Sequence, residues 1–161
     1  MTEVLQAVQP ACFTDLALSI RLHFVYLTKT FQVFANQELV EPPQWLKTIF
    51  KPSRGTLLFK EQAISIIRKL TDFTGFDSYE VLDSIRDTQA QDMEFEQSLL
   101  EGARRNGLSE EDSIELLRQL KHGKLSMHAH DLSMAWLGLR SAWLKVHYPE
   151  PFYEALNYVG Y

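Results

Sequence analysis

Apolar residues recur at helical spacing through most of this 161-residue sequence, and this periodicity restricts the fold more than any other feature. The clearest example lies between residues 59 and 71, where one apolar face is formed by Ala63, Ile66, Ile67 and Leu70, and continues to Phe73. The best candidate strand, Leu57-Leu58-Phe59, is too short and has no matching partner strand. We therefore predict an all-α fold, a compact multi-helix domain.

Turn-forming residues separate the expected helices. Gly75 is predicted to end the helix over residues 59–71, and residues 51–55 are predicted to form a loop. The other expected helices cover residues 16–34, 43–50, 78–86, 91–105, 110–120, 132–147 and 150–158. Buried stripes are expected at Ile114, Leu117 and Leu120, and at Trp136, Leu139 and Trp143.

Length and charge limit the function classes. A chain of this size accommodates one domain or two very small ones, and we expect a single domain over residues 1–161. The net charge of -5 excludes a basic field over the whole surface, so any contact with nucleic acid must be local. Basic residues dominate between residues 47 and 70 and acidic residues between 77 and 115, a segregation that is also typical of solvated helix faces.

Cysteine content and hydropathy exclude further classes. Cys12 is the only cysteine, which rules out an intramolecular disulfide and any Cys-based zinc or iron–sulfur site. The N-terminus has no basic segment followed by an apolar core, and no apolar run approaches the roughly 18 residues of a membrane span. We expect a cytoplasmic protein without a membrane partner.

The densest polar cluster comprises His122, Lys124, His128, His130 and Asp131, just before the last long helix. Three interpretations remain open. The pair His128 and His130 with Asp131 has side chains that ligate metals, although without a spaced third ligand. Lysine and protonated histidine at a helix N-terminus also suit a phosphate group. Alternatively, these side chains cap the helix and face water.

Four segments carry a resemblance to a known family: Gln9–Leu16, Gly55–Ala63, Glu101–Leu108 and Met134–Ala155. In this order and spacing they are similar to the fingers domain in the alpha subunit of bacterial DNA polymerase III, the C-family replicative polymerases. The family patterns are Gln-Pro-x-x-Phe-x-Asp, Gly-x-x-x-Tyr-Gln-Glu-Gln, Glu-Gly-Ala-x-x-Asn-Gly and aromatic-Leu-Lys-x-His-Tyr-Pro-x-x-Phe/Tyr. The resemblance covers about residues 5–155 and implies a fingers-like helical fold.

The resemblance also suggests residues that contact nucleotide or DNA phosphates. His130 falls on the family histidine, with Lys124 and His128 close by, and Arg140 matches a position that is arginine in some members. Lys60 and Arg54, from the basic segment, complete the candidate set.

Other family cations are missing. The Arg-Pro-Gly-Pro turn is replaced by Phe24–Leu27, the Arg-Arg pair by Leu82-Asp83, and the Lys-rich run that follows it by Asp87–Gln89. A carboxylate near a triphosphate repels it, so these departures disfavour nucleotide binding in the family manner.

The family's catalytic carboxylates, which hold two Mg²⁺ ions, lie in a palm domain that 161 residues cannot include. We therefore expect a free-standing, diverged fingers fragment with no catalytic residue, metal or cofactor of its own. One hypothesis is an accessory protein, decoy or regulator that contacts a replisome protein or template–primer DNA. A second is one chain of a split polymerase, active only with a palm-bearing chain. A third is a helical interaction module with an unrelated partner.

Overall fold

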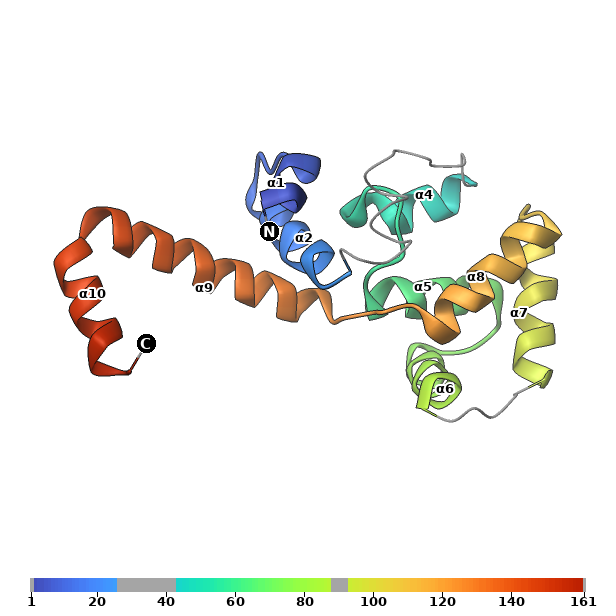
Figure 1. Ribbon diagram of the computed structural model, residues 1–161. Coiled ribbons are helices and arrows are strands. Elements are labelled where there is room, and N and C mark those ends of the chain that lie inside the picture. Colours follow the sequence, from blue (N-terminus) through green and yellow to red (C-terminus); the bar gives the residue numbers. More distant parts are fainter. Residues whose placement is uncertain (1, 26–42, 88–92, 161) are drawn as a thin grey trace.

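The computed structural model describes residues 2–25, 43–87 and 93–160, and every regular element in these ranges is helical (Figure 1). The predicted all-α class is therefore confirmed. The elements are α1 (Thr2–Val8), α2 (Phe13–Phe24), α4 (Gln44–Phe50), the 3₁₀ helix η1 (Lys51–Ser53), α5 (Lys60–Leu70), α6 (Gly75–Asp87), α7 (Met93–Arg105), α8 (Glu110–His122), α9 (His128–His147) and α10 (Pro149–Tyr158).

The larger hydrophobic core lies between α4, α5, α6, α7 and α8. Helix α5 runs through its centre, and the predicted apolar face of this helix is confirmed, since Ala63, Ile66, Ile67 and Leu70 are all buried. Leu82 of α6, Leu99 of α7 and Leu120 of α8 are fully buried against the same core. These five helices form the body of the molecule.

A smaller core joins the two N-terminal helices to the body. Its buried side chains come from α1, from α2 and the residue after it, and from the residues just before α5, namely Val4, Val8, Leu18, Leu22, Val25, Leu58 and Phe59. The segment before α5 therefore connects the two cores, because Leu57 packs in the larger one while Leu58 and Phe59 pack in the smaller one.

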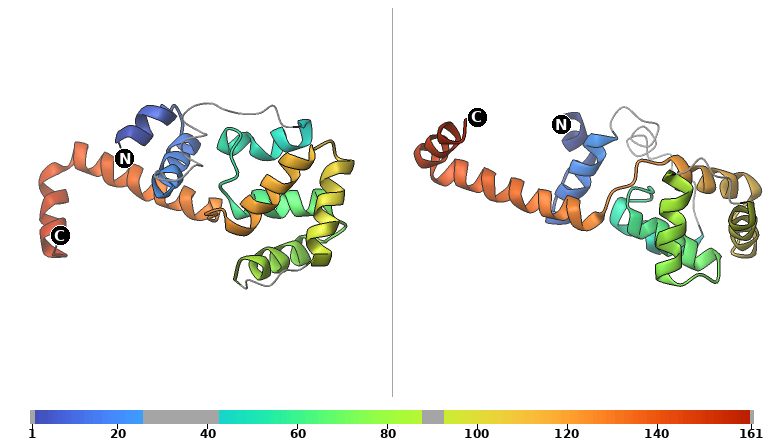
Figure 2. Two further views of the ribbon diagram at one scale, coloured as in Figure 1. Left: turned by 45° about the vertical axis from the view of Figure 1, so that its right-hand side comes forward. Right: turned by 90° about the horizontal axis from the view of Figure 1, so that it is seen from below.

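Helix α9 leaves the body beside α2 and extends well beyond it, and α10 turns away at its far end (Figures 1 and 2). Of the residues in α9, Asp131 and Ala135 are buried, and none in α10 is. The expected buried stripe on α9 is therefore wrong: Trp136, Leu139 and Trp143 are 53%, 45% and 52% exposed. Helical spacing identifies side chains that share a face, but α2 covers only the first half of this helix.

Several predicted boundaries also differ. Gly75 does not end α5 but begins α6, because Thr74 and Asp77 cap α6. The Thr74 hydroxyl oxygen accepts from the Asp77 N–H (3.2 Å), and the Asp77 carboxylate accepts from the Thr74 N–H (3.1 Å). Helix α9 begins at His128 rather than Leu132, so part of the polar cluster lies inside its first turn. Helix α1 and η1 were not expected, and the predicted helix over residues 16–34 is described only as far as Phe24.

The predicted start of α8 is confirmed, but its buried stripe is partly wrong. The Ser109 hydroxyl oxygen accepts from the Asp112 N–H at 3.1 Å. Ile114 is 54% exposed, whereas the buried face consists of Ser113, Leu116, Leu117 and Leu120. These four residues have the i, i+3, i+4, i+7 spacing, and the small polar Ser113 concealed it from the sequence pattern.

The segment from Glu101 to Leu108 forms a close helix crossing and a helix end. A Cβ atom on Gly102 would lie 1.8 Å from the carbonyl oxygen of Leu70, so α7 approaches the end of α5 at a distance that only glycine permits. Asn106 donates its side-chain N–H to the Gly102 carbonyl (2.8 Å), and the Asn106 carbonyl accepts from the Trp45 indole (3.1 Å). This segment therefore fixes α7 against α4 and α5.

We predict that Gly102→Ala destabilises the protein by about 3 kcal/mol, the upper end of what overpacking costs, because α7 must move away from Leu70. Gly138→Ala on α9 is the control, since its Cβ would meet nothing within 4 Å and alanine favours the helix by about 1 kcal/mol. Urea unfolding monitored by circular dichroism measures both. Equal stability of the two variants would contradict the close crossing.

Asp15 ties the N-terminal helices to the body. One carboxylate oxygen bonds Arg54 at 2.7 Å, the other accepts from the Ala11 N–H at 3.0 Å, and Arg54 also donates to the Val8 carbonyl at 2.7 Å. The Ala11 hydrogen bond, followed by the one from Arg54, lowers the pKa of Asp15 below its ordinary value. The stabilisation from this carboxylate is thus present above the unfolded-state pKa and is lost as the pH falls through the lower folded-state pKa.

We predict that Asp15→Asn lowers stability at pH 7 and that its difference from the parent protein disappears as the pH falls below about 4. The parent loses the Asp15 contribution in that range, while asparagine has no charge to lose. Chemical unfolding at a series of pH values measures the difference. A difference that is independent of pH would contradict the ionic role of Asp15.

Candidate functional site

The chain between α8 and α9 is held by two arginines from other helices. Arg86 of α6 donates to the carbonyls of Leu120 (2.8 Å) and Gly123 (2.6 Å), and Arg21 of α2 donates to the carbonyl of Lys124. The first two carbonyls lie at the end of α8 and have no partner within that helix. These bonds fix the direction in which the chain enters α9.

A single parallel bridge joins the same segment to the start of α5. The Ser126 N–H donates to the Leu58 carbonyl (3.1 Å), and the Ser126 carbonyl accepts from the Lys60 N–H (2.8 Å). The Ser126 hydroxyl donates to the Asp131 carboxylate at 2.5 Å, inside the first turn of α9. We call residues 123–131 the α8–α9 junction.

Glu61 caps α9 from the first turn of α5. Both of its carboxylate oxygens accept from the His128 N–H at 3.0 Å, and the His128 ring lies 4.3 Å from the ring of Phe59. The neighbouring Gln62 accepts from the N–H groups of Leu58 and Phe59, each at 3.0 Å. The segment Gly55–Ala63 thus positions α9 through side chains that follow one another in sequence.

Arg21 and Asp131 are buried charged residues at the contact between α2 and α9. Burial lowers the pKa of the Arg21 guanidinium below its ordinary value, and the negative charge of Asp131 opposes this shift. The Nε atom of Arg21 finds no hydrogen-bond partner among the described residues. The contact therefore combines apolar packing with a buried pair of opposite charges.

The structure brings together some of the predicted phosphate-binding residues. Lys124, His128 and His130 all lie in the α8–α9 junction, and the backbone of Lys60 is bonded to it through Ser126. Lys124 and His130 are exposed and His128 is half-buried. Phosphate binding by this group stays a prediction, and the nearest capping group at the helix start is the carboxylate of Glu61.

Arg54 and Arg140 lie apart from that group. The guanidinium of Arg54 bonds Asp15 and Val8 of the N-terminal helices. Arg140 is exposed on α9, ten residues after His130 and hence about 15 Å farther along the helix.

Leu82 and Asp83, which replace the family's Arg-Arg pair, have structural roles, whereas Phe24, in another replaced segment, is 64% exposed. Leu82 is fully buried in the larger core, and Asp83 accepts from the Lys60 ammonium at 2.7 Å, which lowers the pKa of Asp83. Tyr26, Leu27, Thr88 and Gln89, which fall in two other replaced segments, lie outside the described residues. Among residues 2–25, 43–87 and 93–160, no group of three or more His, Cys, Asp or Glu side chains is arranged to hold a metal ion.

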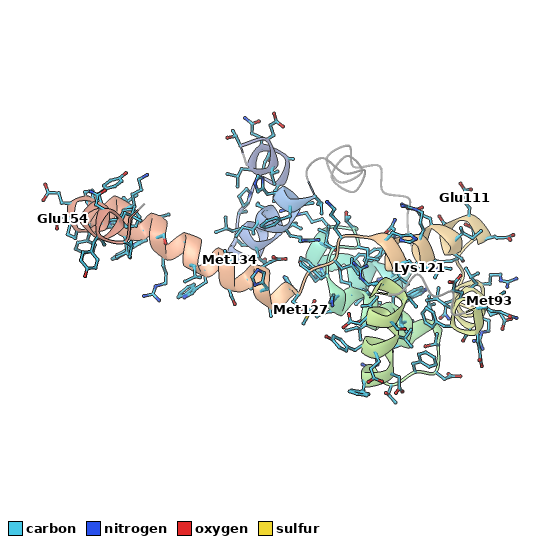
Figure 3. The ribbon with its side chains drawn as sticks, turned by 60° about the horizontal axis from the view of Figure 1, so that its bottom comes forward. Met93, Glu111, Lys121, Met127, Met134 and Glu154 are labelled. Carbon is cyan, nitrogen blue, oxygen red and sulfur yellow. The ribbon has the colours of Figure 1, made fainter. Side chains whose placement is uncertain are left out.

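The sequence did not predict an exposed apolar surface on α9 and α10. We call it the α9–α10 surface; it comprises Met134, Trp136, Leu137, Leu139, Trp143, Leu144, Val146, Tyr148 and Tyr153. Figure 3 shows its side chains beyond Met134, along α9 and toward Glu154 of α10. The available signal was that apolar residues surround α9 on several sides, a pattern typical of a helix enclosed on more than one face. No helix in the described part of the chain has the length and apolar character needed to span a membrane.

Comparison with known proteins identifies the class to which this fold belongs. Residues 1–107 match the model of the bacterial DNA polymerase III alpha subunit finger domain. This match covers most of the chain and contains two of the four segments that carry the resemblance, together with all of the third, Glu101–Leu108, except its last residue. The chain belongs to this finger-domain family, as the sequence predicted.

Individual relatives extend the similarity toward the C-terminus. The chain is 28% identical to the error-prone DNA polymerase of Saccharophagus degradans over 95% of its length and 24% identical to the DNA polymerase III subunit alpha of Escherichia coli K12 over 97%. It is 32% identical to error-prone DNA polymerase 1 of Agrobacterium fabrum over 73% of its length. The aligned regions are 16%, 15% and 11% of these three proteins, so the chain spans only about a sixth of their length or less.

We predict that Glu61→Ala frees the start of α9 and costs about 1 kcal/mol of stability, because the His128 N–H loses its capping carboxylate. Hydrogen exchange at the first turn of α9 should rise, while exchange in α7 stays unchanged. Glu80→Ala, at an exposed position on α6, is the control with the same side-chain loss. Unchanged exchange at His128 in the Glu61 variant would show that the carboxylate does not hold α9.

Proposed function

We propose that this chain acts in DNA replication as an accessory protein, decoy or regulator that binds a polymerase III alpha-type polymerase or another replisome protein through α9 and α10. In this proposal the 161 residues work as a single fingers-like domain. Its membership of the finger-domain family supports the link to replication, as do relatives that are DNA polymerases.

The observation that carries the proposal is the exposure of the α9–α10 surface. Trp136 and Trp143 are about half exposed, and Val146 is 74% exposed. Contiguous apolar side chains of this kind mark protein interaction sites, and tryptophan is among the residues that contribute most to interfaces. The surface also projects from the body on a single long helix, so another polypeptide can reach it without displacing the core (Figure 1).

An accessory role is favoured over nucleotide handling by the local charges. The position of a family cation is occupied by Asp83, whose carboxylate neutralises Lys60, and Arg54 is engaged by Asp15. Two of the six candidate cations are thus paired within the protein. Of the remaining candidates, Lys124, His128 and His130 lie near a helix start whose first N–H group already has a carboxylate partner, from Glu61.

A split polymerase is the second candidate, and the same surface favours it. A chain that supplies the fingers to a palm-bearing chain needs a large apolar contact with that chain, and the α9–α10 surface offers one. The two candidate functions predict different results when nucleotide incorporation is measured. A split polymerase gains nucleotide incorporation when the palm-bearing chain is added, whereas an accessory protein, decoy or regulator alters an incorporation activity that already exists without it.

We predict that the tagged protein retains replication proteins from an extract of its own cells, and that Trp143→Glu or Val146→Glu abolishes this retention because a carboxylate disrupts the apolar contact. Ile114→Glu, at an exposed apolar position on α8, is the matched control and should leave retention unchanged. The retained proteins are identified by mass, with and without nuclease treatment.

Retention that survives nuclease supports protein contacts, and retention lost with nuclease places the association on DNA and contradicts docking through α9 and α10. A palm-bearing polymerase chain among the retained proteins is then tested for restored incorporation. Recovery of no replication protein would overturn the proposed function.

A further inference from the structure

Four exposed apolar residues on α9 lie along one line of the helix. Trp136, Leu139, Trp143 and Val146 are separated by three, four and three residues, which is the spacing of the a and d positions of a coiled coil. Each of them is at least 45% exposed. We call these four residues the α9 seam.

The α9 seam starts where α2 stops covering α9. Ala135 is buried beneath α2, and the ring of Trp136 meets the edge of Phe13, the first residue of α2, at 6.2 Å. Beyond this contact, the Trp143 ring packs against His147 (4.6 Å) and Tyr148 (5.7 Å). The exposed rings are therefore already held in position before any partner binds.

The two flanks of the α9 seam differ in chemistry. Arg140 and His147 follow the two tryptophans by four residues and form one flank. Ala135 and Ala142 precede the tryptophans by one residue and form the other; Ala135 is buried, whereas the short side chain of the exposed Ala142 allows a neighbouring backbone to approach closely. No acidic residue of α9 lies beside the exposed part of the seam, because Asp131, its only carboxylate, is buried near α2.

A second copy of α9 does not fit these flanks. In an antiparallel pair related by a two-fold axis, each flank meets its own copy, which sets Arg140 and His147 of one chain against those of the other. In a parallel pair, they face Ala135 and Ala142 and gain no partner. Neither arrangement supplies a negative charge for Arg140.

We propose that the α9 seam binds an amphipathic helix from a different polypeptide segment, with apolar residues along one face and carboxylates on the flank that meets Arg140. The contact between α2 and α9 also pairs opposite charges, but with the signs exchanged, since α2 supplies the positive Arg21 and α9 the negative Asp131. This inference rests on the proposed function, because it names the kind of partner that the α9–α10 surface accepts.

The test uses two designed peptides of about 21 residues, long enough to form a helix on binding. Both have leucine at the a and d positions; one has glutamate at the flanking e and g positions and the other has lysine. We expect the complete 161-residue protein to bind the glutamate peptide about tenfold more tightly than the lysine peptide, measured by fluorescence anisotropy of labelled peptide. Arg140→Glu should reverse this preference.

Lys145→Glu is the matched control, because it makes the same charge change on the same helix but away from the seam, where the Lys145 ammonium lies 5.6 Å from the Tyr153 ring. This variant should keep the preference for the glutamate peptide. Circular dichroism verifies that each variant remains helical. Equal affinity for both peptides, binding of neither, or a stable homodimer in analytical ultracentrifugation that Arg140→Glu leaves intact would overturn the inference.

The peptide test and the extract experiment fail independently. Replication proteins retained through Trp143, together with no peptide binding, would leave the proposed function standing and remove only the helical, acidic partner. Peptide binding without any retained replication protein would contradict the proposed function. The α9 seam would then still be a helix-binding site, but its partner would not be a replication protein.

Discussion

The capping of α9 by Glu61 is the interaction on which the rest of the arrangement depends. A carboxylate at the start of α5 accepts from the first N–H of α9, and the Ser126 bridge holds the two segments side by side. Helix α5 lies in the centre of the larger core, so α9 takes its direction from a well-packed part of the body. The exposed second half of this twenty-residue helix keeps a defined orientation because the base of the helix is anchored in this way.

The segments that carry the family resemblance have structural roles in this chain. Gln62 and Glu61 connect the start of α5 to its neighbours, Gly102 permits the crossing of α7 and α5, and Asp15 ties the N-terminal helices to Arg54. The side chains common to three of the four family patterns thus hold helices together, whereas those of the fourth segment, Met134–Ala155, are largely exposed. Of the positions where family cations are missing, Leu82 contributes to the larger core and Asp83 to an internal ion pair.

Sequence periodicity predicted the helices of the body well because each of them packs against neighbours on one side. The stripe of α5 and the Ser109 cap of α8 are local features, and both were found where expected. The wrong prediction for α9, in contrast, concerns information that lies outside the segment. Whether Trp136 is buried depends on how far α2 extends along α9. The sequence of α9 alone does not give the extent of this contact.

The same reasoning turns the wrong prediction into the strongest functional evidence. An exposed apolar stripe is a surface on which the binding of another polypeptide is favourable, since burial of its tryptophan and valine side chains lowers the free energy. The flank of that stripe then restricts the partner, because a cation such as Arg140 loses its hydration in a contact unless the other side provides a negative charge. Apolar spacing therefore specifies that a helix binds to α9, and the charge beside it specifies which kind of helix.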